Sequence, residues 1–216
     1  MTGLMMKDAL VMRKTLRLYA LFLLFYSGLA VLGVFPMSMA LAMVEVIVMV
    51  LPISSFSYDE AAKWDRYAAV LPVGRTAVVK ARYLFLLLVL LAAAAIGLVG
   101  SILASLLARE DLGELLATLL VSMGLGLMIA DILLPVVYHL GPERARPWMY
   151  VIIFAPIVVL LGGAKLGLFD GIDLSWLDQL PELAVLGVFA LVPLVPLVGM
   201  LLSCWISCRI YARKEF

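Results

Sequence analysis

The chain has 216 residues, of which 66% are hydrophobic and 14% charged. Its mean hydropathy of +1.17 is far too high for a soluble domain of this length, so the composition predicts an integral membrane protein and excludes a soluble enzyme. The net charge of +1 gives no indication of a nucleic-acid partner, because the basic residues are distributed among several loops and do not form one patch.

The first element expected is a helix over residues 1–15 that lies in the headgroup layer. One helical face is apolar and the other basic, with Met5, Ala9, Met12 and Leu16 against Lys7, Lys14 and Arg17. We expect the methionine stripe to be shielded and the two lysines to point toward headgroups or solvent. No small-residue cleavage site follows these charges, so the first apolar run should be retained as a span.

Six apolar runs follow, each near or above the roughly 20 residues that cross a bilayer. The predicted spans are about 18–35, 37–57, 80–107, 115–139, 148–168 and 183–211. The expected fold class is therefore an all-α integral membrane protein, with residues 1–216 forming one transmembrane domain. No internal repeat is visible in the sequence.

Small residues and prolines within the spans indicate how the helices pack. Gly97, Ser101 and Ser105, and likewise Ser122 and Gly126, are spaced so that neighbouring helices could approach closely. Prolines within spans remove a backbone hydrogen bond and permit kinks, and they occur at Pro52, Pro135, Pro156, Pro193 and Pro196.

The connection between spans two and three, residues 58–79, is the longest polar interruption in the first half of the chain. Its spacing predicts an amphipathic helix ended by Pro72, with Trp64, Tyr67, Ala68 and Leu71 on one face and Asp59, Lys63 and Arg66 on the other. Asp59 and Lys63 are four residues apart in the order that favours an ion pair. A second helix should begin near Arg75, and a solvated loop is the alternative interpretation.

The distribution of lysine and arginine predicts the orientation. All but two of the 16 basic residues fall in the amino end, the 58–83 stretch, the turn at 139–148 or the carboxyl tail; the exceptions are Arg109 and Lys165. Both termini are therefore expected in the cytoplasm. The outer connection at 169–181 carries Trp176 among Asp170, Asp173 and Asp178, which indicates a short surface helix begun by Asp173 or Ser175, or a solvated loop.

The sequence offers little for catalysis. The one histidine, His139, stands beside Gly141 and Pro142, where a helix C-terminus explains it. Cys204 and Cys208 have no third metal ligand nearby and are expected to be buried small side chains. We predict no catalytic residue, no metal site and no bound cofactor, and the absence of a phosphate-loop motif means that any ATP would be bound by another chain.

Two acids fall where hydropathy disfavours them. Glu45 lies near the middle of the second span, and Asp131 lies about two turns from the end of the fourth. A charge facing lipid there would cost a few kcal/mol, so both should face the bundle interior. They could join two helices by hydrogen bonds. Alternatively, they could line a substrate cavity that favours the basic face of an amphipathic peptide.

The run Phe56-Ser57-Tyr58-Asp59-Glu60, with Trp64, Leu71-Pro72-Val73-x-Arg75 and Val79-Lys80-x-Arg82-Tyr83, resembles the signature of bacterial type-2 ABC transporter permeases. The opening Leu4-x-x-Lys7-Asp8 is similar too. Within that family the chain most resembles the membrane subunits of exporters for short amphipathic peptides, of the phenol-soluble modulin type. Permeases of bacteriocin-immunity or drug-efflux systems are the alternative.

The resemblance implies a permease of the bacterial cytoplasmic membrane that works as a pair, either as a homodimer or with a related permease, in contact with membrane lipid. Two ATPase subunits would lie beneath it and bind ATP and Mg. The loop between spans two and three would be the coupling helix that contacts the ATPase, through Asp59, Glu60, Lys63, Trp64, Arg66 and Tyr67.

Two functions of other classes remain open. A membrane-embedded enzyme, or its regulatory subunit, would need a nucleophile, base or metal cluster that the sequence does not display. A proton-driven carrier could use Glu45 and Asp131, but inverted repeats would be expected and none is visible.

Overall fold

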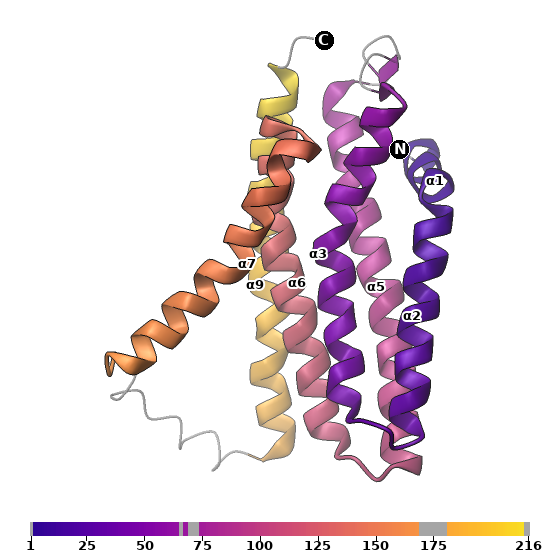
Figure 1. Cartoon of the computed structure of the whole chain (residues 1–216), viewed down its shortest axis with the longest axis vertical. Helices are drawn as coiled ribbons and strands as arrows, with labels where there is room; N and C mark the ends of the chain where they lie inside the picture. The colour runs from indigo at the N-terminus through magenta and orange to yellow at the C-terminus, as the bar shows by residue number, and fades with distance from the viewer. Residues whose placement is uncertain (1, 65–66, 69–73, 169–180, 214–216) are drawn as a thin grey trace.

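The computed structural model describes residues 2–64, 67–68, 74–168 and 181–213. In this part of the chain all regular elements are helices. They are α1 (Thr2–Val11), α2 (Arg13–Val31), α3 (Met37–Ala61), α5 (Arg75–Leu107), α6 (Leu112–Leu140), α7 (Pro142–Lys165) and α9 (Glu182–Ala212). Figure 1 shows an elongated bundle, with α1 and the last turn of α9 at the same end.

Six of these helices, all except α1, are long and apolar enough to cross a membrane. The expected all-α membrane class is therefore confirmed. Several helices extend beyond the predicted spans: α3 continues to Ala61, α5 begins at Arg75 and α7 begins at Pro142. A helix satisfies its own backbone groups, so it can continue into polar surroundings where hydropathy no longer marks it. The surface helix predicted around Trp176 lies outside the described residues.

The predicted helix over 1–15 is divided in two. α1 ends at Val11, α2 begins at Arg13, and Met12 between them is only 1% exposed. The buried methionine fixes the corner between the two helices. A single interfacial helix over 1–15 is therefore wrong, because its last residues already belong to the first span.

Caps fix the connections at the far end of the bundle from α1. Gly33, after α2, has a φ of 74°, which glycine adopts without steric cost. The backbone N–H of Met37 donates to both carboxylate oxygens of Glu110 at 3.2 Å, so the α5–α6 link caps α3. Asp111 caps α6 by accepting from the N–H of Glu114 at 3.0 Å.

Helices α3, α5 and α6 form the packed centre of the bundle. A methyl group at Gly126 of α6 would lie 3.3 Å from the Cα of Glu45 on α3, and one at Gly97 of α5 would lie 3.1 Å from Leu41. The predicted close approach at these glycines is confirmed. By contrast, only 6% of the residues in the most apolar 18-residue stretch of α7 are buried. This helix leans away from the bundle (Figure 1).

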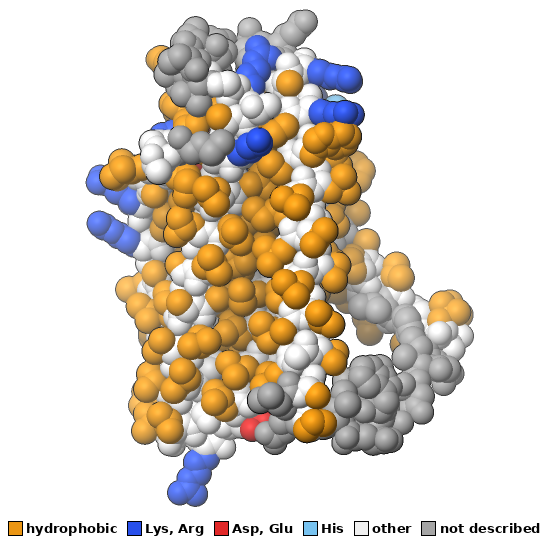
Figure 2. Space-filling view, turned by 180° about the vertical axis from the view of Figure 1, so that it is seen from behind, with side chains coloured by type: hydrophobic (Ala, Val, Ile, Leu, Met, Phe, Trp, Pro, Cys, Tyr) orange, Lys and Arg blue, Asp and Glu red, His pale blue; other side chains and the backbone are white. Residues whose placement is uncertain are grey.

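The surface has an apolar band between polar ends (Figure 2). Basic side chains gather at the end that carries α1, which we call the basic end. The described basic residues there are Lys7, Arg13, Lys14, Arg17, Lys63, Arg75, Lys80, Arg82, Arg144, Arg146, Arg209 and Arg213. This pattern suits a multi-pass membrane protein whose two faces differ in charge.

Candidate functional site

Four charged side chains from three helices meet at the basic end, and we call them the charge cluster: Lys7 and Asp8 of α1, Asp59 of α3, and Arg82 of α5. Lys7 Nζ lies 2.8 Å from Oδ1 of Asp8 and 2.8 Å from Oδ1 of Asp59. Arg82 Nη2 lies 3.3 Å from Oδ1 of Asp8 and also contacts Oδ2 of Asp59. Two cations and two carboxylates thus neutralise one another.

The cluster is buried. Asp8 and Arg82 are each 5% exposed, and Asp59 is 9% exposed. The side chain of Lys7 is 19% exposed and lies between two carboxylates, so the prediction that it points toward headgroups or solvent is wrong. Isolated charges cannot be buried at this depth without a large desolvation penalty, and mutual pairing offsets it.

Helical spacing explains why each charge faces inward. Asp8 lies on the same side of α1 as Met5, three residues before it, and the buried Met12 follows four residues later, just beyond the end of α1. Asp59 follows the buried Ser55 by one turn on α3. Arg82 stands among buried residues of α5, namely Val78, Val79, Phe85 and Leu86.

Aromatic rings enclose the cluster and connect it to the far side of the bundle. Lys7 Nζ lies 4.2 Å from the ring centroid of Trp64, and the Arg82 guanidinium lies 4.5 Å from that of Phe56. Phe56 packs edge-on against Tyr138 of α6, with ring centroids 4.6 Å apart. Tyr138 in turn packs against Tyr211 of α9 at 5.5 Å. A continuous chain of contacts therefore runs from α1 to α9.

The segment after α3 differs from the predicted amphipathic helix. α3 ends at Ala61 and Lys63 has a φ of 51°, so the helix does not continue straight into Trp64. Asp59, predicted on the outer polar face beside Lys63, instead points inward to Lys7 and Arg82. The reason is electrostatic, because Arg82 and Lys7 are buried beside it and need a carboxylate.

Trp64 also packs inward, against the hydrophobic core of its own chain. The exposed members of the predicted contact are Glu60, Lys63 and Tyr67, of which Tyr67 is 64% exposed. Arg66 lies outside the described residues. The predicted ATPase-contact residues thus fall into two groups. Asp59 and Trp64 attach the segment to the rest of the chain, whereas Glu60, Lys63 and Tyr67 are exposed on its surface.

The two acids within the spans are half-buried, and the described part of the chain provides neither with an ion pair. Asp131 lies where α6 meets α9, with its Oδ2 3.2 Å from a methyl group placed at Gly199. Its Oδ1 is buried and has no hydrogen-bond partner among the described atoms. Glu45 lies where α3 meets α6, its Cα against Gly126. Each acid lies at a helix contact, on opposite sides of α6.

A neighbouring hydroxyl network connects three helices. The hydroxyl of Tyr83 on α5 lies 2.7 Å from Ser203 Oγ and 2.8 Å from Ser207 Oγ on α9. Ser203 also donates to the backbone carbonyl of Asp131. Tyr83 directly follows Arg82, so one turn of α5 contacts both the charge cluster and the helix that carries Asp131.

A model of the ABC-2 family of transporter proteins matches residues 3–212. The chain belongs to the ABC-2 family. No curated protein and no solved structure matches it.

Membership of the ABC-2 family makes this chain a membrane transport component, and such permeases work with a partner ATPase. The described residues contain no group of three potential metal ligands. Cys204 and Cys208 are half-buried on α9 and not fully buried as predicted, and His139 lies exposed in the last turn of α6 before Gly141.

Sequence reasoning missed the role of Asp8 and Arg82 in this permease, although both stand within the motifs that carry the family resemblance. The available signal was their helical position, since each charge falls on an otherwise apolar face. A buried charge requires a partner, but spacing along one helix does not identify it.

Proposed function

We propose that this ABC-2 family chain is the membrane-spanning permease subunit of an ATP-driven exporter of small amphipathic peptides, coupled at its basic end to a separate ATPase. The charge cluster is the observation that carries the proposal. It attaches the end of α3 to α1 and α5 by buried ion pairs, which resist separation more than exposed pairs do.

The ATPase contact is proposed for the outward surface of the segment after α3. Glu60, Lys63 and Tyr67 are exposed there, whereas Asp59 and Trp64 hold the segment from within. A displacement of this segment by the ATPase would be transmitted to α1 and α5 through the cluster. Through Phe56 and Tyr138 it would also reach α6.

The substrate path is proposed to pass the two acids within the spans. Their carboxylates would attract the basic face of an amphipathic peptide, and the surrounding apolar side chains would accept its other face. With six candidate spans among the described residues of one chain, a pore of twelve would require a second copy or a related permease.

The first test measures peptide uptake into inside-out vesicles that contain the permease with its ATPase. Replacing Glu45→Gln and Asp131→Asn together should abolish uptake of a cationic amphipathic peptide and leave basal ATP hydrolysis intact. Glu143→Gln, an exposed acid at the start of α7, is the matched control and should transport normally. Undiminished uptake by the double variant would exclude a substrate role for the two acids.

The second test measures ATPase binding by co-purification. Tyr67→Ala should weaken association roughly tenfold, because an exposed aromatic side chain docked in a partner's cleft can contribute a kcal/mol or more. Tyr150→Ala, on the exposed surface of α7, is the control. Trp64→Ala should also weaken association, by loosening the segment that presents Tyr67. Equal recovery of the ATPase with all variants would contradict the proposed contact.

A further inference from the structure

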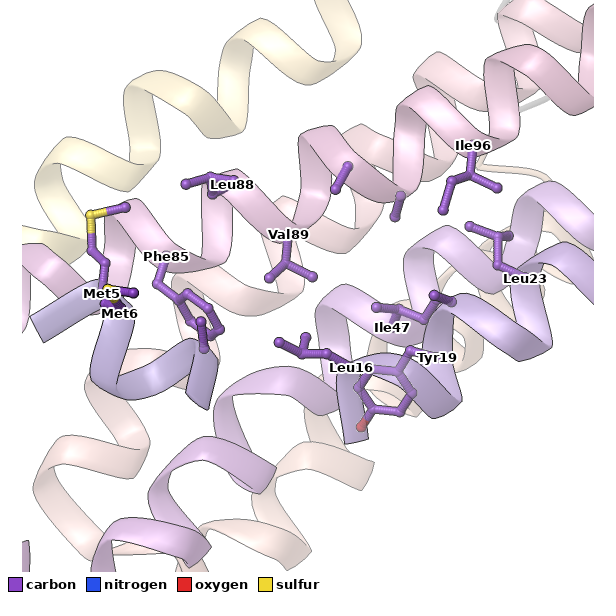
Figure 3. A pocket seen from close by; sticks show the side chains of 14 residues that line it. Met5, Met6, Leu16, Tyr19, Leu23, Ile47, Phe85, Leu88, Val89 and Ile96 are labelled. Atoms are coloured by element: carbon purple, nitrogen blue, oxygen red, sulfur yellow. The ribbon is translucent and has the colours of Figure 1, made fainter. Parts of the chain in front are cut away.

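An apolar cavity of about 390 Å³ lies between α1, α2 and α5, with Ile47 of α3 also lining it. Figure 3 shows Met5 of α1, Leu16 and Leu23 of α2, and Phe85 and Val89 of α5 around one space. Tyr19 is the lining residue with a polar side chain, and its hydroxyl lies 3.3 Å from Ser54 Oγ. The cavity therefore offers an occupant hydrocarbon contacts and very little hydrogen bonding.

The size and shape of the cavity suit a chain-like hydrocarbon. An apolar cavity of about 150 Å³ in a protein core can bind benzene, and this one is more than twice as large. A second apolar cavity of about 470 Å³ continues along the seam between α2 and α5 and shares Ile96 with the first. On α5 the two together extend from Phe85 to Leu103, about 27 Å at the helical rise.

This length is close to the roughly 30 Å hydrocarbon thickness of a bilayer. Both α2 and α5 are candidate spans whose neighbouring side chains, such as Leu21 and Leu91, are exposed on the surface of the chain. The seam is thus open where a membrane protein contacts lipid.

Positive charge lies beside the end of the cavity that α1 covers. Arg13, Lys14 and Arg17 are exposed at the start of α2, and Arg13 is one turn before the cavity-lining Leu16. Basic side chains at this level attract anionic lipid headgroups. Among hydrocarbon ligands, positive charge at this position would favour one with an anionic head.

We propose that this cavity binds an acyl chain of an anionic phospholipid from the leaflet at the basic end, with the phosphate beside Arg13 and Arg17. The bound chain fills the space between α1 and α5 close to the charge cluster, and so holds α1 in place. This site is separate from the proposed substrate path and does not depend on the proposed function.

The experiment counts lipids retained by the purified full chain, by native mass spectrometry after reconstitution in phosphatidylglycerol or phosphatidylcholine. The wild-type chain should retain phosphatidylglycerol at least tenfold better. Ala92→Trp, which fills the cavity from α5, should abolish retention, while Leu91→Trp on the adjacent exposed face should not. Arg13→Gln with Arg17→Gln should remove the preference, and Arg109→Gln at the opposite end should preserve it.

Several outcomes would overturn the assignment. Equal retention of both lipids by the wild-type chain would exclude a headgroup site, and equal retention by the two tryptophan variants would exclude the cavity. A tryptophan variant that keeps its lipid but loses a second copy of the chain would assign the groove to a protein contact. Ala20→Leu, on the α2 wall, provides the same comparison if Ala92→Trp does not fold.

Discussion

Charged side chains occur in two apolar regions of this permease, with opposite arrangements. In the charge cluster, two cations and two carboxylates contact one another and are covered by aromatic rings. Within the spans, Glu45 and Asp131 stand at helix contacts, and the described residues supply neither with a cation. In the first arrangement the charges compensate one another, whereas in the second the buried Oδ1 of Asp131 has no hydrogen-bond partner among the described atoms.

This difference separates buried charges that compensate one another from acids for which we propose a role in transport. When the members of a cluster neutralise one another, removal of any single member is strongly destabilising, because the remaining charges are then buried without compensation. Replacing an acid that has no ion pair leaves no oppositely charged partner uncompensated, so the free energy of unfolding should change little. The following predictions test that contrast.

The largest effect is expected from Arg82→Ala. It leaves Asp8 and Asp59 sharing Lys7 alone, and should lower the free energy of unfolding by about 3–5 kcal/mol. Thermal unfolding in detergent micelles measures the effect. Lys80→Ala, which removes an exposed charge from the same helix, is the control and should be nearly neutral.

Replacing all four members together, by Lys7→Met, Asp8→Asn, Asp59→Asn and Arg82→Met, should cost less than Arg82→Ala alone. Neutral side chains leave no uncompensated charge, so the effects are not additive. A quadruple variant less stable than Arg82→Ala would mean that the ion pairs contribute net stability beyond compensating one another.

A smaller effect is expected from Gly199→Ala on α9. The added methyl group would lie 3.2 Å from Oδ2 of Asp131 and should destabilise the α6–α9 contact by about 1 kcal/mol. Gly187→Ala on the same helix meets no atom within 4 Å and should be neutral or stabilising. Equal stability of the two variants would show that the Asp131 carboxylate moves aside freely.

A still smaller effect is expected from Glu45→Gln and Asp131→Asn, each made singly. Because neither acid belongs to an ion pair in the described structure, the free energy of unfolding should change by less than about 1 kcal/mol. Thermal unfolding of these variants and of Arg82→Ala under the same conditions compares their losses of stability directly. A loss as large as that of Arg82→Ala would place the acid among the structural charges.

The smallest effect is expected from Glu143→Ala, which removes an exposed ion pair to Arg146 at 3.3 Å. Exposed pairs of this kind contribute less than about 0.5 kcal/mol. The same unfolding measurement at low and high salt should show little change. A larger loss would show that Glu143 makes a stabilising interaction within the chain beyond this exposed ion pair.

Much of the fold was predictable because a bilayer imposes strict requirements on sequence. Each span must be long and apolar, so hydropathy located all six candidates, although their ends were displaced where helices continue into polar surroundings. The close approach at Gly97 and Gly126 also followed from local spacing. The predicted outward position of Asp59 failed, because an amphipathic pattern read along one helix omits the charges of its neighbours.

The sequence by itself determined the membrane class, the six apolar helices and the family resemblance, since these depend on composition and on motifs along the chain. The sequence also contains, as a signal that was not used, the position of Asp8 and Arg82 on otherwise apolar helical faces. Only the tertiary structure decided their partners: Arg82 lies 74 residues from Asp8, and Lys7 lies 52 residues from Asp59. The energy of a buried ion pair depends on distance in space, which helical spacing within one segment does not specify.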